Sequence, residues 1–272
     1  MEQEYFARGR FGEIMRTEDG KVLKLFFPEY PREKAEAEFR NAKYAYELGC
    51  TPIKVYEMVE RDGRFGFTMD YCPGVSGNDM AFKKPAYILR GGKDLAAQHA
   101  LVHSKKCHEL RDIRAYVCGV LDTCPHMDFL TEDEKERAKK YIMSLPEEDT
   151  VLHLDLHTGN MMVDADGTVR IIDWTEASRG NRAVEIALMR FFFTEAELFA
   201  EATPLQNWIY ARLRTVVGKP FFKEYRRLMP YSDEDVEKYS LIAYIYRREW
   251  DLVTERTKLS NHIKRCIEER CR

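Results

Sequence analysis

The first 70 residues consist of short apolar runs with one amphipathic segment among them. The run VLKLFF at 22–27 is apolar except for one lysine. The segment 32–49 has apolar residues at three-to-four-residue spacing and ends at a glycine, which predicts a helix with one buried face. The runs 53–61 and 64–72 flank Asp62-Gly63, a pair that favours a tight hairpin turn. This pattern predicts a β-rich N-terminal region that contains one helix.

A short connector separates this region from a mostly helical remainder. The stretch PGVSGN at 73–78 is rich in glycine, proline and serine, which is typical of a connecting loop. The sequence Thr131-Glu-Asp-Glu134 matches a capping box at a helix start. Only the interlude 151–174 is again rich in β-forming residues. Helices are expected over 93–110, 131–144, 183–201, 204–217, 219–228, 232–250 and 254–270.

Together these elements predict an α+β fold with two lobes. The expected division is a small β-rich lobe at 1–70, a hinge at 71–76 and a larger, mostly helical lobe at 77–272. A chain of 272 residues is long enough for one large domain or for two lobes that share a cleft.

The composition narrows the class of protein. Hydrophobic residues make up 44% and charged residues 33%, an ordinary globular balance, and the net charge of −3 gives no basic surface for nucleic acid. No apolar run reaches the roughly 18 residues of a membrane helix, and the start MEQEYFARGRF lacks a signal-peptide pattern. The seven scattered cysteines, without a C-x-x-C pair, fit reduced thiols better than disulfides or a zinc site. We therefore expect a cytoplasmic protein that binds neither nucleic acid nor membrane; its oligomeric state is not readable from the sequence.

Candidate chemistry concentrates in the β-rich interlude. HLDLHTGN occupies 153–160 and IIDW occupies 171–174. Asp155 and Asn160 bracket a loop between two expected strands, and Asp173 ends a third strand after an Asp-Gly turn. This order can bring three oxygen-bearing side chains together at the ends of neighbouring strands.

These residue types favour phosphoryl transfer over a histidine metal site. Mg²⁺ prefers oxygen ligands, so Asn160 and Asp173 suit it and the histidines do not. Asp155 can then orient a hydroxyl group and accept its proton. One aspartate as base, with an asparagine and a second aspartate on the metal, is the division of labour in phosphoryl transfer.

The spacing of these residues resembles that of a known superfamily. D-x-x-x-x-N, followed by an aspartate 13 residues after the asparagine, resembles the protein-kinase-like catalytic core. The text H-x-D-L-H-x-G-N … I-D-W is similar to the aminoglycoside phosphotransferase and choline kinase branch. The resemblance implies a bilobal protein-kinase-like fold and transfer of phosphate from ATP.

The chain departs from the family text at several positions. Leu154 stands where the family has glycine after the first histidine. The segment 180–187 matches the position of the family's G-D-P-x-x-D-L-A, with Asn181 and Glu185 in place of its two acids. By this resemblance, Glu185 is a candidate brace for the catalytic loop, although its side chain is longer than that of aspartate.

The resemblance also implies a buried ion pair that holds the ATP phosphates. Lys24 lies within an otherwise apolar strand, where a charge is costly unless it is paired. Glu33, Glu36 and Glu38 compete as its partner on the following helix. Glu38 lies in the register that the family suggests, and Glu36 is the second choice.

Two further parts of the nucleotide site follow from the resemblance. Gly9 and Gly12 in ARGRFGEI are the candidates for a reduced phosphate-covering loop, whose backbone N–H groups can approach phosphate. The backbone groups of Asp70 and Cys72 in FTMDYCPG are expected to pair with the adenine edge. Because backbone groups read the base, GTP is not excluded.

The histidines are expected to be structural. In the family the first histidine of the motif, here His153, is a packed spacer that shapes the catalytic loop. His157 is expected to orient Asp155 or the loop, and His99 and His103 match a structural L-x-x-L-H segment.

The expected acceptor is a hydroxyl group of a small molecule of the aminoglycoside, choline or amino alcohol, or sugar type. Arg179 and Arg182 would favour an acidic or phosphorylated sugar. A protein kinase is disfavoured because only six residues separate Asp173 from Gly180; a lipopolysaccharide-sugar kinase stays an alternative. A non-catalytic nucleotide-binding relative is a third reading. It usually lacks a core lysine, aspartate or asparagine, all of which are present here.

Overall fold

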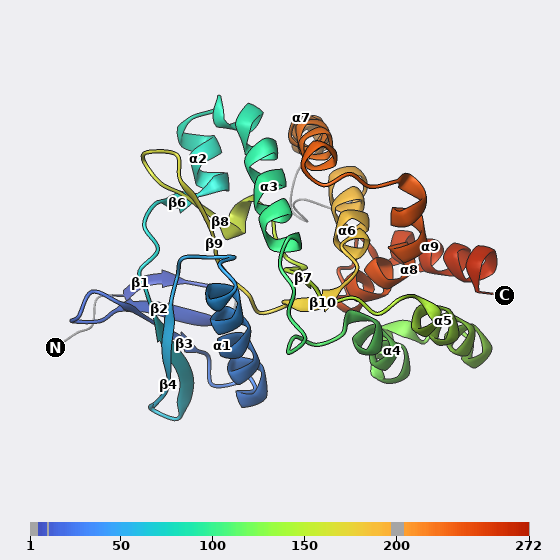
Figure 1. Ribbon diagram of the computed structural model, residues 1–272, viewed down its shortest axis with the longest axis horizontal. Helices are drawn as coiled ribbons and strands as arrows, with labels where there is room; N and C mark the ends of the chain where they lie inside the picture. The colour runs from blue at the N-terminus through green and yellow to red at the C-terminus, as the bar shows by residue number, and fades with distance from the viewer. Residues whose placement is uncertain (1–4, 10, 197–203, 272) are drawn as a thin grey trace. The chain divides into compact units, whose positions relative to one another are not determined.

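The computed structural model describes residues 5–9, 11–196 and 204–271 (Figure 1). Its contacts divide the chain into two compact units. The first unit comprises Met1–Pro85 and Asp155–Ala177, and the second unit comprises Ala86–Leu154 and Ser178–Arg272. A segment from the middle of the chain therefore belongs with the N-terminal residues.

The first unit is built on a five-stranded antiparallel sheet with the strand order β1-β2-β3-β5-β4. The strands are β1 (Tyr5–Arg8), β2 (Gly12–Arg16), β3 (Val22–Phe26), β4 (Val55–Arg61) and β5 (Arg64–Met69). The expected hairpin between β4 and β5 is confirmed. Asp62 and Gly63 both have positive φ angles, 52° and 71°, as a two-residue hairpin turn of matching twist requires.

Helix α1 (Arg32–Glu47) covers one face of this sheet (Figure 1). The core beneath it consists of Phe26, Ala35, Val55 and Phe67, with Phe39 and Ala42 packed against them. The helix ends at Glu47, and the expected stop signal, Gly49, follows two residues later with a φ angle of 72°. The spacing of apolar residues on α1 thus set which face the helix buries.

The first unit also contains a second small sheet with the order β6-β8-β9. Its elements are β6 (Val75–Ser76), β8 (Met161–Val163) and β9 (Val169–Ile171), accompanied by helix α2 (Gly77–Lys83) and the 3₁₀ turn η2 (Thr158–Asn160). The hydroxyl of Thr51, after α1, donates to the Ile171 carbonyl oxygen at 2.9 Å. This bond ties the strand before Asp173 to the end of α1.

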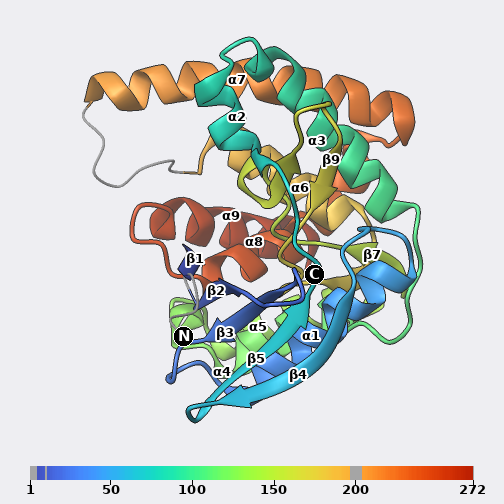
Figure 2. The same ribbon diagram turned by 90° about the vertical axis from the view of Figure 1, so that its left-hand side faces the viewer.

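The second unit is almost entirely helical (Figure 2). Its helices are α3 (Tyr87–His103), α4 (Ile113–Thr123), η1 (Pro125–Met127), α5 (Glu132–Ser144), α6 (Ala183–Thr194), α7 (Pro204–Leu228), α8 (Asp233–Glu249) and α9 (Arg256–Arg270), and its two strands β7 (Thr150–Leu152) and β10 (Ser178–Gly180) pair antiparallel. The capping box at Thr131 and Glu134 is present. None of the helices in the described ranges has the length and apolar character needed to cross a bilayer. The expected α+β fold class is confirmed.

Three helix expectations need correction. The helix expected over 93–110 is α3, which begins at Tyr87 and ends at His103. The helices expected over 204–217 and 219–228 form one helix, α7, which carries Pro220 inside it. Tight packing against α3 accompanies this continuity, since a Cβ atom added at Gly92 would lie 2.2 Å from the Val217 carbonyl oxygen. Tertiary packing therefore outweighs the weak helix propensity of proline. The helix expected over 183–201 ends at Thr194, and its expected last residues lie outside the described part of the chain.

Candidate active site

A buried ion pair lies at the centre of the first unit. Lys24, in the middle of β3, contacts the Oε1 atom of Glu38 on α1 through its ammonium group. The Glu38 side chain is buried, at 3% exposure, and the Lys24 side chain is largely buried, at 16%. Glu36 instead accepts a hydrogen bond of 2.8 Å from Arg32 at the surface. Of the competing glutamates, Glu38 is therefore the one that contacts Lys24.

Asp173 influences both members of this pair. Burial lowers the pKa of Lys24, but the charges of Glu38 and Asp173 outweigh burial and raise it. Burial raises the pKa of Glu38, and the Asp173 charge adds to this effect against the opposing influence of Lys24. The charges of Glu38 and Asp173 thus both favour the ammonium form of Lys24, the form that can bind an anionic ligand.

The loop 155–160 orients the side chain of Asp155. The amide nitrogen of Asn160 donates to the Asp155 carbonyl oxygen at 2.9 Å and to its Oδ2 atom at 3.2 Å. The imidazole of His157 lies 3.8 Å from the Oδ1 atom of Asp155, and its Nδ1 atom accepts from the Gly159 N–H. Asp155 keeps 28% side-chain exposure. This carboxylate is thus oriented from both sides and still accessible.

Asp173 follows β9 in an unusual backbone conformation. Its φ angle is 64°, in the left-handed region that non-glycine residues rarely adopt. The hydroxyl of Thr175 donates to its Oδ1 atom at 2.6 Å. Such backbone strain persists only where surrounding contacts fix it, and it is common at functional sites.

The side chains of Asn160 and Asp173 fit a magnesium ion by their donor chemistry. Asn160 directs its amide nitrogen to Asp155, so its side-chain oxygen is the atom that can coordinate a cation. Asp173 adds a carboxylate. Hard oxygen donors of this kind suit Mg²⁺, which retains several water ligands of its own.

The expected phosphate loop lies at the turn between β1 and β2, and its Arg10 lies outside the described residues. The Gly9 N–H donates to the Gly12 carbonyl oxygen at 2.8 Å. A Cβ atom added at Gly12 would lie 2.6 Å from the Leu25 carbonyl oxygen. The sheet therefore requires glycine at position 12 for packing alone, and phosphate binding by this turn stays a prediction.

The expected hinge residues follow β5. The Asp70 N–H donates to the Lys54 carbonyl oxygen at 2.9 Å, and its carboxylate accepts from the Lys54 N–H and the Tyr56 hydroxyl. These contacts engage the backbone N–H and the side chain of Asp70, so of its two backbone groups the carbonyl oxygen is the one left to the predicted adenine contact. Burial raises the pKa of the Cys72 thiol to about 11.

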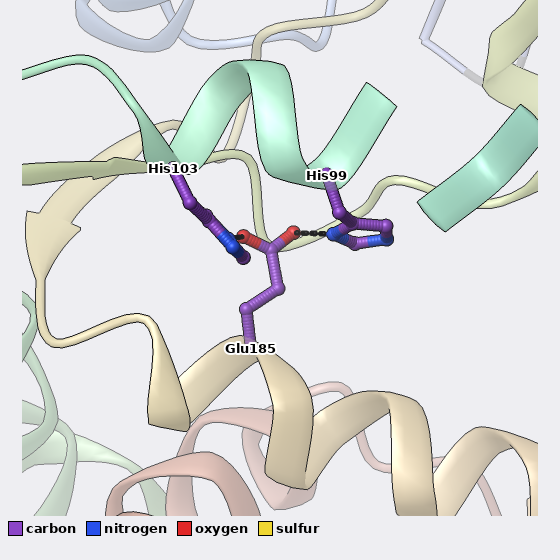
Figure 3. Close-up of side chains that lie close together, drawn as sticks. All are labelled: His99, His103 and Glu185. Atoms are coloured by element: carbon purple, nitrogen blue, oxygen red, sulfur yellow. Dashed lines mark hydrogen bonds and ion pairs between the residues drawn. The ribbon is translucent and has the colours of Figure 1, made fainter. Parts of the chain in front are cut away.

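In the second unit, a buried hydrogen-bond network holds the backbone just before Asp155 (Figure 3). Glu185 points from α6 between His99 and His103 on α3. Its Oε2 atom accepts from the His153 N–H at 3.0 Å, and its Oε1 atom accepts from the Leu154 N–H at 2.9 Å. Glu185 thus holds the backbone of the motif by two direct hydrogen bonds, as the resemblance suggested.

The same network determines the charge of Glu185. Burial raises its pKa, but a hydrogen bond from His103 and the charges of His99, His103 and His153 outweigh burial and lower it to about 2. His103 also lies 2.7 Å from the Tyr225 hydroxyl through its other ring nitrogen. The ligand atoms of Glu185, His99 and His103 lie within 4.8 Å of one another. Because backbone N–H groups already occupy both carboxylate oxygens, a structural network accounts for this cluster without a metal ion.

Leu154 adopts the left-handed conformation, with φ of 64°. This angle gives a physical reason for the glycine that the related motif has here, since glycine adopts it without steric conflict. The leucine side chain is 2% exposed. Burial of that side chain offsets the backbone strain that a non-glycine residue brings to this position.

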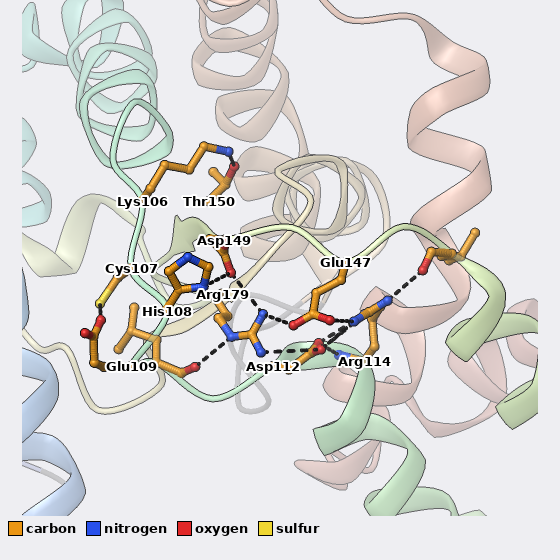
Figure 4. A network of polar contacts seen from close by, with 12 residues as sticks. Lys106, Cys107, His108, Glu109, Asp112, Arg114, Glu147, Asp149, Thr150 and Arg179 are labelled. Carbon is orange, nitrogen blue, oxygen red and sulfur yellow. Dashed lines mark hydrogen bonds and ion pairs between the residues drawn. The ribbon is translucent and has the colours of Figure 1, made fainter.

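The two arginines that suggested an anionic acceptor are engaged in contacts within the second unit. Arg179 forms ion pairs with Glu147 and Asp149 at 2.6 and 3.1 Å (Figure 4). Arg182 donates to the Pro230 carbonyl oxygen at 2.7 Å. Both guanidinium groups thus have structural partners, and the sequence argument for a phosphorylated acceptor loses its force.

The fold and the arrangement of charged side chains define a phosphotransferase with a kinase-like architecture. The model of the "Phosphotransferase enzyme family" matches residues 14–216, and the chain belongs to that family. No curated protein sequence matches the chain.

Solved structures with the same fold are distant in sequence. An aminoglycoside-3'-phosphotransferase of type VIII is 18% identical, with a TM-score of 0.55 over 88% of this chain and 90% of that one. Choline kinase LicA from Streptococcus pneumoniae is 15% identical, with a TM-score of 0.57 over 98% and 91%. A thermostable mutant of aminoglycoside phosphotransferase APH(4)-Ia, in a ternary complex with AMP-PNP and hygromycin B, is 14% identical, with a TM-score of 0.55 over 98% and 93%.

Proposed function

We propose that this chain is an ATP-dependent kinase that transfers the γ-phosphate to a hydroxyl group of a small acceptor. The observation that carries the proposal is the buried ion pair between Lys24 and Glu38, with Asp173 close enough to shift the pKa of both. A largely buried ammonium group needs a functional reason, because burying charge is expensive. Binding of phosphate oxygens by Lys24 supplies one.

The nucleotide is proposed to bind along the first unit. Lys24 pairs with the phosphates, the backbone at Gly9 and Gly12 approaches them, and the Asp70 carbonyl and Cys72 N–H meet the adenine edge. The structure of LicA in complex with AMP and the APH(4)-Ia complex with AMP-PNP support a nucleotide in this fold. Because the base is read by backbone groups, GTP stays an alternative to ATP.

Asp155 is proposed as the base. Its carboxylate orients the acceptor hydroxyl and takes its proton as the hydroxyl oxygen bonds to the γ-phosphorus. The bond between that phosphorus and the β–γ bridging oxygen breaks, and ADP leaves with the electron pair. Asn160 and Asp173 would hold Mg²⁺, which when bound neutralises charge on the phosphate oxygens.

The acceptor is proposed to be an aminoglycoside, choline or another amino alcohol, or a sugar. The similar solved structures are named for aminoglycosides and for choline, and one contains hygromycin B. The internal ion pairs of Arg179 remove the sequence argument for a phosphorylated acceptor.

Two measurements on the purified chain test the proposal. Melting temperature should rise with millimolar MgATP or MgGTP, because a ligand that binds the native state stabilises it. ADP release should then be measured with a panel of aminoglycosides, amino alcohols, sugars, lipopolysaccharide sugars and peptides. No thermal shift with either nucleotide would reject nucleotide binding. A shift without turnover on any acceptor would favour a non-catalytic relative, and turnover on peptides alone would favour a protein kinase.

A further inference from the structure

Helix α1 makes a second contact near the site, one turn beyond Glu38. The side-chain amide nitrogen of Asn41 lies 3.2 Å from the carbonyl oxygens of Trp174 and Thr175, and 3.5 Å from that of Ala177. The Ala177 N–H closes the same turn on the Trp174 carbonyl oxygen at 3.2 Å. One amide group therefore gathers three carbonyls of the turn that directly follows Asp173.

The backbone before Asp173 is fixed as well. The hydroxyl of Thr51 donates to the Ile171 carbonyl oxygen at 2.9 Å, and Thr51 is only 4% exposed. Asp173 itself has a φ angle of 64°. A left-handed conformation is unfavourable for a non-glycine residue, so its neighbours must determine its conformation. The hydrogen bonds from Thr51 and Asn41 flank Asp173 on both sides and can do so.

We propose that Asn41 is a positioning residue for Asp173. It fixes the turn 174–177 so that the Asp173 carboxylate faces the metal-bound nucleotide; this inference rests on the metal role proposed for Asp173. The side chain must be a donor, because three carbonyl oxygens converge on it. Aspartate has the same shape but would present a carboxylate to those oxygens, and alanine would remove their donor.

The position of Asn41 on α1 gives this contact a second consequence. Glu38 and Asn41 are three residues apart, so they lie on the same face of the helix. Glu38 holds Lys24, and Asn41 holds the turn after Asp173. A displacement of α1 therefore moves the phosphate-binding lysine and the metal-binding aspartate together.

Metal binding gives a test that does not depend on the acceptor. The Kd of Mn²⁺ should be measured by electron paramagnetic resonance with saturating AMP-PNP, and the Kd of AMP-PNP by calorimetry in EDTA. Asn41→Asp and Asn41→Ala should raise the Mn²⁺ Kd about tenfold or more, equivalent to about 1.4 kcal/mol, and change the metal-free nucleotide Kd less than about twofold. Asn41→Gln keeps the donor and should recover part of the affinity. Thr51→Val, which removes the other flanking donor, should weaken Mn²⁺ binding in the same direction.

Lys43→Ala is the matched control, because Lys43 lies on the same helix and is exposed, at 3.9 Å from Glu47. It should leave both constants unchanged.

Normal Mn²⁺ affinity in Asn41→Asp, beside metal-dependent binding in the wild type, would overturn the inference. An equal loss of metal-free nucleotide binding would also overturn it, since that indicates general disruption. If Asn41→Asp does not fold, Asn41→Ala and Thr51→Val decide by the same criteria. Absence of any metal dependence in the wild type, or its persistence in Asp173→Asn, would instead reject the metal role of Asp173.

Discussion

The carboxylate of Glu185 accepts a hydrogen bond of 2.9 Å from the backbone nitrogen of Leu154, the residue that precedes the proposed base. A second N–H, from His153, reaches the other carboxylate oxygen. Position 185 on α6 thus controls backbone 32 and 31 residues earlier in the chain. The geometry of the motif therefore depends on a charged side chain that is itself buried.

The charge of Glu185 should make stability depend on pH. Its folded-state pKa is lowered from 4.5 to about 2, so its contribution is present above about pH 4.5 and is lost as pH falls toward 2. That contribution is roughly 3 kcal/mol. Urea unfolding between pH 7 and pH 2.5 should show a smaller acid-dependent loss in Glu185→Gln than in the wild type. Faster amide exchange at His153 and Leu154 should accompany that variant.

Glu234→Gln, at an exposed acid on α8, is the control for this pH profile and should resemble the wild type. A constant stability difference between wild type and Glu185→Gln at every pH would contradict the ionised state of Glu185.

Breaking the pair between Lys24 and Glu38 should destabilise the first unit. Lys24→Met or Glu38→Leu alone leaves one buried charge without its partner, which costs about 3–5 kcal/mol. The double variant should recover much of that stability and still fail to bind nucleotide. Chemical unfolding and calorimetry with AMP-PNP measure the two effects. Glu36→Gln, in a surface pair with Arg32, should change stability by less than about 0.5 kcal/mol. A double variant as unstable as either single variant would argue against pairing as the cause.

Replacement of the proposed base should separate chemistry from binding. Asp155→Asn keeps the shape of the side chain and removes its ability to accept a proton. On an acceptor found by the ADP-release panel, kcat should fall about 10²–10⁴-fold, with the AMP-PNP Kd changed less than about threefold. Asp166→Asn, at an exposed position before the turn glycine 167, should leave kcat unchanged. Full activity of Asp155→Asn would show that another group takes the proton.

At position 154, glycine should give a more stable protein than alanine, the reverse of their usual order. Both Leu154→Ala and Leu154→Gly lose a side chain that is 2% exposed, so each should be less stable than the wild type by about 2–4 kcal/mol. Alanine keeps the strain of the left-handed backbone, whereas glycine relieves it. Leu154→Gly should therefore be more stable than Leu154→Ala by about 1 kcal/mol in urea unfolding.

The same two substitutions at Leu152 provide the control. Leu152 is fully buried in the neighbouring strand β7, and its φ angle is not positive. Alanine should be the more stable variant there, because glycine loses more backbone entropy on folding. If alanine were also the more stable variant at position 154, strain would not explain the glycine of the related motif.

Local features of the chain were predictable from the sequence. Asp62-Gly63 specified a hairpin through its own backbone preferences, and the spacing from Asp155 to Asn160 specified a short loop whose ends meet. The pairing of Lys24 was expected only from the resemblance, because strand alternation alone would turn this lysine toward solvent. The choice of Glu38 over Glu36 needed the resemblance as well, since both residues fit the helix equally well.

Features that depend on distant contacts were not readable. Whether a residue adopts positive φ, as Leu154 does, is decided by the turn around it and not by leucine's own preference. Asn41 gave no signal, because an asparagine on a helix is ordinary until its carbonyl partners are known. The sequence also did not predict that α7 continues through Pro220. Proline disfavours a helix locally, but packing against α3 stabilises the continuous helix.

The division of the chain into units has a consequence for folding during synthesis. The N-terminal sheet belongs to a unit that also contains Asp155–Ala177, and about 70 residues of the other unit are translated between its two parts. Closing so long a loop carries an entropic cost, and contacts of high sequence separation slow folding. The nascent N-terminal region must therefore wait for residue 177 before its contacts are complete. Truncated chains that end before β7 should consequently be poor folders and candidates for chaperone binding.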